Sequence, residues 1–146
     1  MHVSFAWIAY GAYHVSAGVA VLYLLKERWA RKGEPNIPAA LKKLPDLAIM
    51  DGLIAQLIEY GFLAHIIMIG AGAIWAYGLW GRYWNWDPIE TWSLISWIIY
   101  GINIHMRMTY GWKGKKGAWL AAASLAAVII TFGGIGFIGG VHTPLL

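Results

Sequence analysis

The stretch 80–97, WGRYWNWDPIETWSLISW, decides how this chain folds and where its chemistry lies. It gathers half of the ten tryptophans around one short polar turn. No regular helix can run through its centre, because Pro88 lacks a backbone donor and disfavours helical geometry in the residue before it. An interfacial aromatic belt is the simple interpretation, but a belt would account for only about two or three of these tryptophans. Aromatic rings this dense, beside Arg82, Asp87 and Glu90, suit a flat amphipathic ligand at a membrane surface.

The composition predicts a membrane protein. The chain has 146 residues, of which 60% are hydrophobic and only 12% are charged, so a water-soluble surface could hardly be covered. Four apolar stretches, at 3–25, 60–80, 89–106 and 118–141, are each near the roughly 20 residues needed to cross about 30 Å of hydrocarbon. We therefore expect an all-α integral membrane protein with about four transmembrane helices.

The basic residues predict the orientation of these helices. Ten of the eleven basic residues fall between the first and second stretches or between the third and fourth. They are Lys26, Arg28, Arg31, Lys32, Lys42, Lys43, Arg107, Lys113, Lys115 and Lys116. The positive-inside rule places both connections in the cytoplasm, so both termini and the Trp-rich loop should lie on the outer face of a plasma or inner membrane. The net charge of +4 is then explained by topology, and we expect no nucleic acid partner.

Two absences narrow the possible chemistry. The chain has no cysteine, so it can hold no disulfide, thiolate metal site or thiol relay. The first apolar stretch lacks a basic n-region and a small-residue cleavage site, so we do not expect a cleavable signal peptide.

Two of the five histidines are expected beside the Trp-rich loop. His2 begins the first predicted span and His142 ends the fourth, so both should emerge on the outer face. Two neutral imidazoles on opposite sides of one plane are a common way to hold a haem iron. For either histidine alone, simple solvation is the more ordinary interpretation.

The other three histidines lie within the predicted spans. His105 is near the cytoplasmic end of the third, where it could simply anchor the helix end beside Arg107. His14 and His65 are deeper, where an ionisable group suggests function. A neutral imidazole that donates to a neighbouring helix carbonyl is the simpler interpretation of His14, while His65 and Glu59 remain open.

The quoted stretch resembles the tryptophan-rich "WWD" signature of the cytochrome c assembly family, W-G-x-Y-W-x-W-D-P-K-E-T-W, with Ile89 in place of the usual Lys. Other segments are similar to the CcsA (ResC) branch of that family. MDGLIAQLIEYGF at 50–62 resembles L-D-x-L-x-Y-R-x-I-x-x-G-F, although Ala55 and Gln56 replace its Tyr and Arg. NIHMR at 103–107 resembles L-H-x-R, and the segments 2–13 and 139–146 resemble the opening and closing histidine motifs. The match covers nearly the whole chain but only the C-terminal half of a usual CcsA. We thus expect one transmembrane domain over 1–146 without the family's earlier helices.

The resemblance implies a set of haem-binding residues. His2 and His142 match the two outer histidines that ligate the haem iron, and His105 matches a transmembrane histidine on the path of haem from inside to outside. Arg82 could pair with a haem propionate. The remaining matches form the haem-facing loop: Trp80, Trp84, Trp86, Asp87, Pro88, Glu90 and Trp92. Asp87 and Glu90 are expected to organise that loop, with Asp87 as the N-cap of the following helix.

The implied function is cytochrome c biogenesis. The chain would hold b-type haem non-covalently on the outer face and present it to apocytochrome c for covalent attachment, as part of a cytochrome c synthase (haem lyase). No residue resembles a catalytic nucleophile, so a scaffold role is expected. The implied partners are the lipid bilayer and either a CcsB/ResB-like membrane protein or the missing N-terminal half.

Three alternatives stay open at this point. A CcmC-like protein would deliver haem to a chaperone instead of joining it to a cytochrome. A small electron-transfer subunit would hold b-type haem inside the bundle, through residues such as His14 and His65. A structural fragment would bind no haem at all.

Overall fold

The computed structural model describes residues 2–33 and 37–131. Within these residues the chain forms five helices and no strand, so the predicted all-α class is confirmed. The helices are α1 (His2–Ala30), α2 (Ala39–Lys42), α3 (Leu47–Trp80), α4 (Pro88–Tyr110) and α5 (Lys115–Ile129).

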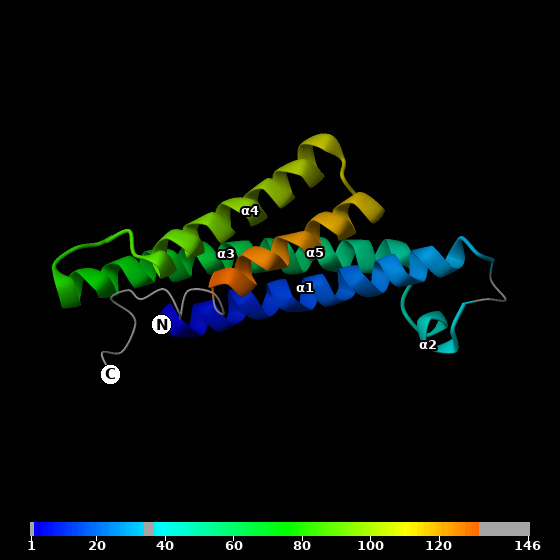
Figure 1. Cartoon of the computed structure of the whole chain (residues 1–146), viewed down its shortest axis with the longest axis horizontal. Helices are drawn as coiled ribbons and strands as arrows, with labels where there is room; N and C mark the ends of the chain where they lie inside the picture. Colours follow the sequence, from blue (N-terminus) through cyan, green and yellow to red (C-terminus); the bar gives the residue numbers. More distant parts are fainter. Residues whose placement is uncertain (1, 34–36, 132–146) are drawn as a thin grey trace.

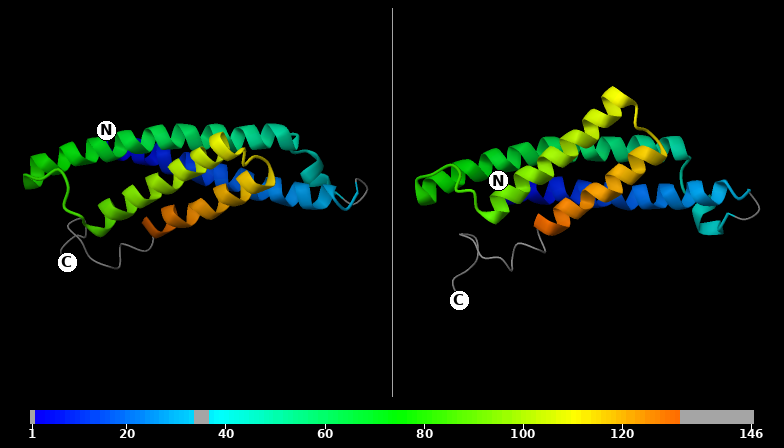
Figure 2. Two further views of the ribbon diagram at one scale, coloured as in Figure 1. Left: turned by 90° about the horizontal axis from the view of Figure 1, so that it is seen from above. Right: turned by 45° about the horizontal axis from the view of Figure 1, so that its top comes forward.

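The two longest helices form the frame of the molecule. Helices α1 and α3 run antiparallel and side by side, and α4 and α5 pack across one side of this pair (Figures 1 and 2). Close approach of α1 and α3 depends on small residues, because a Cβ built on Gly61 would lie 2.6 Å from a ring atom of Tyr13. Small residues at such contacts are typical of helices that pack in membranes, where backbones must come close to gain dispersion energy.

Two helices are long and apolar enough to cross a membrane, namely α1 and α3. Only 28% of the most apolar 18-residue window of α3 is buried inside the protein, so this helix is not the covered core helix of a soluble domain. Large apolar side chains such as Ile67 and Ile74 lie exposed along it, as expected for a surface that faces lipid. In the described part of the chain, neither α4 nor α5 is both long enough and apolar enough to cross a membrane by the same measure. A four-span arrangement therefore remains a prediction.

Helix α3 begins at Leu47, well before the predicted start of its apolar stretch at residue 60. Its 34 residues make a helix about 51 Å long, which exceeds the roughly 30 Å hydrocarbon core. The added turns contain Asp51, whose charge is matched by another helix. Arg107 of α4 donates from Nη1 to Oδ1 at 3.0 Å and from Nη2 to Oδ2 at 2.7 Å. The backbone N–H of Gly114 donates to the same carboxylate at 2.8 Å. The Asp51 carboxylate is therefore neutralised by a contact from α4 and from the turn before α5, and α3 continues through this charged residue.

Removal of the Asp51 charge should loosen this end of the bundle. We expect Asp51→Asn to cost roughly 2 kcal/mol, less than the 3–5 kcal/mol of a fully buried pair, because the Arg107 guanidinium would keep its charge without a carboxylate. Arg107→Lys should give an intermediate loss, because an ammonium cannot bind both carboxylate oxygens in the same planar geometry. Thermal unfolding in detergent measures the effect, with the exposed Lys43→Gln as control. An unchanged midpoint in Asp51→Asn would contradict the assignment.

Candidate functional site

The connection 81–87 is defined by how the two flanking helices end and begin. Helix α3 ends at Gly81, which has a φ of +69° and donates its N–H to the Tyr77 carbonyl at 2.9 Å. A left-handed cap of this kind favours glycine, which has no Cβ to clash. Helix α4 begins after Asp87, whose side chain accepts from the N–H of Glu90 at 2.9 Å. Pro88 occupies the first turn, where its missing N–H costs nothing. The predicted N-cap role of Asp87 is confirmed.

Glu90, the other acidic residue of this region, stabilises the connection 81–87 by binding its backbone. The Glu90 Oε2 accepts from the backbone N–H of Asn85 at 2.7 Å, so Asp87 and Glu90 act in a reciprocal arrangement similar to a capping box. Trp86, directly before Asp87, has a φ of +59°, a conformation that is strained for a large side chain. The rings of Trp84 and Trp86 meet edge to face, with centroids 5.8 Å apart. Both carboxylates therefore serve the shape of this turn.

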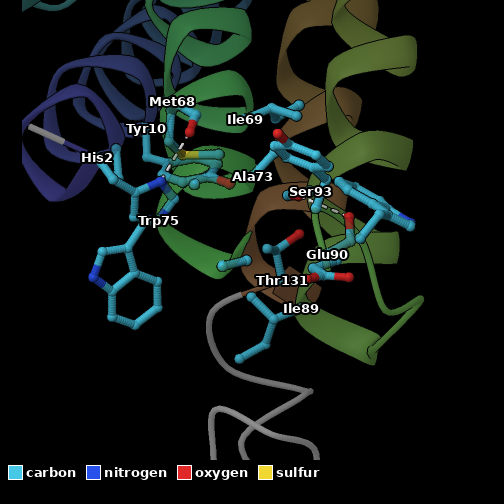
Figure 3. A pocket seen from close by; sticks show the side chains of 15 residues that line it. His2, Tyr10, Met68, Ile69, Ala73, Trp75, Ile89, Glu90, Ser93 and Thr131 are labelled. Atoms are coloured by element: carbon cyan, nitrogen blue, oxygen red, sulfur yellow. Dashed lines mark hydrogen bonds between the residues drawn. The ribbon is translucent and has the colours of Figure 1, made fainter. Parts of the chain in front are cut away.

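The connection closes one side of a cavity of about 270 Å³ (Figure 3). The cavity lies between the start of α1, the last third of α3 and the start of α4. Its walls are mainly apolar, and a few polar side chains interrupt them. The apolar wall includes Met68, Ile69, Ala73, Trp75 and Ile89, and the polar groups include His2, Trp84, Glu90, Ser93 and Thr131. The start of the chain and the Trp-rich loop thus lie at the same end of the bundle, as predicted; the membrane face on which this end lies remains a prediction.

His2 lines this cavity and is oriented by a specific partner. Its Nδ1 lies 2.8 Å from the carbonyl oxygen of Met68 on α3 (Figure 3). A carbonyl can only accept, so Nδ1 is the donor, and in the neutral tautomer that fits this bond Nε2 has the free lone pair. Metal-binding histidines are usually held in this way, by a hydrogen bond from the other ring nitrogen to a carbonyl or carboxylate. Gly72 makes room for the ring, because a Cβ built there would lie 2.7 Å from Nδ1.

The indole of Trp84 is a further polar side chain of the cavity lining. Trp84 lines the cavity, and its buried Nε1 makes no hydrogen bond within the described residues. An unpaired buried N–H typically costs about 1–3 kcal/mol, so such groups are uncommon in native proteins. A bound ligand that offers an oxygen acceptor would remove this cost.

Six other residues predicted for the site lie near the cavity without lining it. Trp80 ends α3 and packs edge to face on Trp75, with centroids 5.5 Å apart. Trp92 is half-buried on α4, and its carbonyl accepts from Thr131 Oγ1 at 3.4 Å. The other four belong to the connection or to the first turn of α4: Arg82, Trp86, Asp87 and Pro88. Of these, Arg82 and Trp86 are exposed to solvent or lipid.

The remaining predicted residues are not brought to the cavity. His105 is exposed near the far end of α4, with Nδ1 3.3 Å from Thr109 Oγ1 and its ring edge-on to Tyr110. His142 lies outside the described residues. Within residues 2–33 and 37–131, no group of three or more histidine, cysteine or acidic side chains could hold a bare metal ion.

The two deeper histidines both have hydrogen-bond partners, although only His65 is buried. His14 bonds through Nδ1 to the Tyr10 carbonyl at 2.7 Å, so its carbonyl partner belongs to its own helix and not to a neighbouring one. His65 is fully buried, with Nε2 3.4 Å from the Tyr10 hydroxyl and Nδ1 3.3 Å from the Tyr13 hydroxyl. With both ring nitrogens occupied, His65 is a poor candidate for a haem ligand, and this disfavours the electron-transfer alternative.

Some residues of the cavity were not found from the sequence. Gly72 and Trp75 carry no motif of their own, although an isolated glycine in an apolar helix is a known sign of close packing. Tyr10 lies in the segment 2–13 that resembles the opening histidine motif, but the resemblance assigns it no role at the site. Ser93 lies on α4 and Thr131 just after α5, and both line the cavity only because the bundle folds.

A sequence model of the family described as Cytochrome C assembly protein matches residues 1–142. The chain belongs to this family. A protein named cytochrome c biogenesis protein CcsA from Guillardia theta is 34% identical over 98% of the chain and 52% of its own length. The protein of that name from Chlamydomonas reinhardtii is 36% identical over 98% of the chain and 39% of its own length. The one from Trichodesmium erythraeum (strain IMS101) is 40% identical over 77% of the chain and 32% of its own length. This family member thus spans about a third to a half of the curated relatives it matches, and no solved structure matches it.

The position of His2 in this family member should depend on the absence of a side chain at residue 72. We expect Gly72→Ala to displace the imidazole and break its bond to Met68, with a stability loss below about 1 kcal/mol because a terminal ring can move. Nitrogen-15 NMR of histidine-labelled protein would detect the changed Nδ1 environment. Gly70→Ala is the matched control, since a Cβ there meets nothing within 4 Å. Identical His2 signals in the two variants would contradict the assignment.

Proposed function

We propose that this chain takes part in cytochrome c biogenesis and holds haem as cargo at the cavity between His2 and Trp84. The observation that carries the proposal is the bond from His2 Nδ1–H to the Met68 carbonyl, which orients a cavity-lining imidazole and leaves Nε2 of the neutral ring available to a metal. The names of the CcsA relatives support a role in cytochrome c biogenesis. The orientation of the His2 ring supports haem as the bound molecule.

The other residues of the cavity suit the chemistry of haem. The macrocycle is flat and apolar, so the apolar wall of Ile69, Ala73 and Trp75 would bury it favourably. A propionate oxygen would satisfy the unpaired Nε1 of Trp84, and a hydrogen bond to a charged acceptor is among the stronger ones. Glu90 already accepts from Asn85, so its charge is partly compensated.

The cavity alone would hold only part of the macrocycle. Its volume of about 270 Å³ is close to the lower limit of ordinary ligand sites, near 300 Å³. We therefore propose that His142 supplies the second iron ligand and Arg82 a partner for the other propionate. His105, at the far end of α4, is proposed for an earlier step of the haem path.

The proposed reaction places haem where the apocytochrome can react with it. A cysteine thiol of the apocytochrome adds across a haem vinyl group: the sulfur bonds to one vinyl carbon, the thiol hydrogen ends on the other, and the double bond is lost. This addition consumes no oxidant or reductant. The chain would contribute orientation, because a fixed haem and a docked peptide make the step effectively unimolecular.

Other polypeptide segments would complete the proposed cytochrome c biogenesis assembly. We propose that a CcsB/ResB-like protein, or the part of the longer relatives that this chain does not match, completes the assembly in the membrane. The proposed location of the haem site is the outer face of a plasma or inner membrane, because most basic residues lie at the opposite end of the predicted spans.

The role of His2 is tested by the optical spectrum of purified protein titrated with ferric haem. We expect a low-spin spectrum for the parent chain, and weaker, high-spin binding for both His2→Ala and His142→Ala, because each removes one axial ligand. Added imidazole should restore the low-spin form in His2→Ala. His14→Ala is the control and should retain the parent spectrum. Low-spin binding of undiminished affinity in His2→Ala would sink the proposal.

The role of the Trp84 indole is tested by Trp84→Phe, which keeps an aromatic ring and removes the N–H donor. Loss of a hydrogen bond to a charged acceptor should weaken haem binding about tenfold or more. Trp29→Phe, in the part of α1 remote from the cavity, should bind as the parent does. The same titration with a haem whose propionates are esterified should abolish the difference between Trp84→Phe and the parent. If the esterified haem still distinguishes them, the indole does not bind a propionate.

A further inference from the structure

A groove of about 560 Å³ lies at the other end of the bundle from the cavity, between the end of α1 and the start of α5. Its lining combines apolar side chains with a cluster of cations. The apolar members include Val21, Leu24, Leu25, Trp119 and Ala122, and the cations are Arg28, Arg31 and Lys115. Glu27 is its one acidic member.

The two helices arrange these residues in the same order along the bundle axis. On α1, Arg28 follows Val21 by seven residues, which is two helical turns and roughly 10 Å. On α5, which starts at this end, Lys115 precedes Trp119 by one turn. The two helices run in opposite directions (Figure 1). The order of the lining residues along each helix therefore puts the cations toward one end of the groove and the apolar residues further in. The groove is therefore charged at its outer end and apolar along its length.

The charges of the groove are unbalanced. The Glu27 carboxylate is already paired with the guanidinium of Arg31, which directly follows the end of α1. Arg28 and Lys115 are both exposed, and neither forms an ion pair within residues 2–33 and 37–131. Two cations without a carboxylate partner at one mouth favour an anionic ligand.

We propose that this groove binds an anionic phospholipid. Its phosphate would lie between Arg28 and Lys115, and an acyl chain would follow Val21, Leu25 and Trp119 toward the middle of the bundle. The length and exposed apolar surface of the neighbouring helices place lipid within reach, and basic pockets between membrane helices are known to recognise anionic head groups. Lipid bound here would stabilise the contact between α1 and α5. The proposal does not depend on haem binding at the opposite end.

Native mass spectrometry of the delipidated chain in detergent, titrated with dioleoyl phosphatidylglycerol or dioleoyl phosphatidylcholine, tests the proposal. We expect the parent chain to bind phosphatidylglycerol more tightly than phosphatidylcholine. The double variant Arg28→Gln with Lys115→Gln should weaken it about twenty- to thirtyfold, since each cation near a headgroup accounts for about fivefold. The matched control, Lys42→Gln with Lys43→Gln, removes the same charge outside the groove and should bind as the parent does. Lys115→Arg should retain the affinity.

Three results would overturn the proposal, and the first two concern the lipid titrations. One is equal binding of the two lipids by the parent chain. The other is an equal loss of affinity in the groove variant and in its control, which would indicate general charge attraction. Trp119→Ala distinguishes a lipid from a free phosphate: it should weaken binding of the lipid, and glycerol phosphate should not compete at the same concentration. Full competition by glycerol phosphate would mean that the groove recognises a soluble anion instead. Circular dichroism of each variant confirms that the helices are intact.

Discussion

The carboxylate of Asp51 is the contact on which the arrangement of the other helices depends. It accepts from the Arg107 guanidinium and from the N–H of Gly114, and so joins α3, α4 and the turn before α5 at one point. Gly114 has a φ of +64°, and a Cβ there would lie 3.1 Å from the Tyr23 hydroxyl, so the same turn packs against α1. An unpaired charge in an apolar helix is expensive, whereas a bidentate pair with a third donor satisfies most of its acceptors. Because this end of α4 is fixed on α3, the start of α4 meets α3 where the cavity forms.

The opposite end of the bundle is organised by local chemistry. Gly81 ends α3, and Asp87 and Glu90 bind backbone N–H groups of the connection and of the first turn of α4. Both carboxylates thereby stabilise the shape of the turn, and the side chains of His2, Trp84, Ser93 and Thr131 are the other polar members of the cavity lining. A site of this kind is suited to binding and orientation, and its polar groups match an iron and a carboxylate better than they match a reaction that needs a nucleophile.

Buried polar contacts fix how the helices pack along their lengths. Ser16 donates to the Ile54 carbonyl at 3.2 Å, and the amide of Asn103 donates to Ser124 at 3.2 Å. His65 lies between the hydroxyls of Tyr10 and Tyr13. Contacts of this type contribute only about 0.6 kcal/mol each on average in membrane helices, so their main effect is on register. Tyr10 connects this interior to the site, because it also lines the cavity.

The sequence by itself determined the helical class, the break at Pro88, the cap at Asp87 and the nearness of His2 to the Trp-rich loop. Each of these follows from backbone chemistry within a few residues or from the length of an apolar run. Only the tertiary structure decided that α3 continues through Asp51, that the Met68 carbonyl orients His2 and that the Trp84 indole N–H has no hydrogen-bond partner within residues 2–33 and 37–131. Asp51 and its partner Arg107 are 56 residues apart in the chain, and His2 and Met68 are 66 residues apart. Apolar periodicity shows that a helix has a packed face, but which carbonyl meets which side chain depends on the rotation and register of two helices, and these are fixed only when the helices pack together.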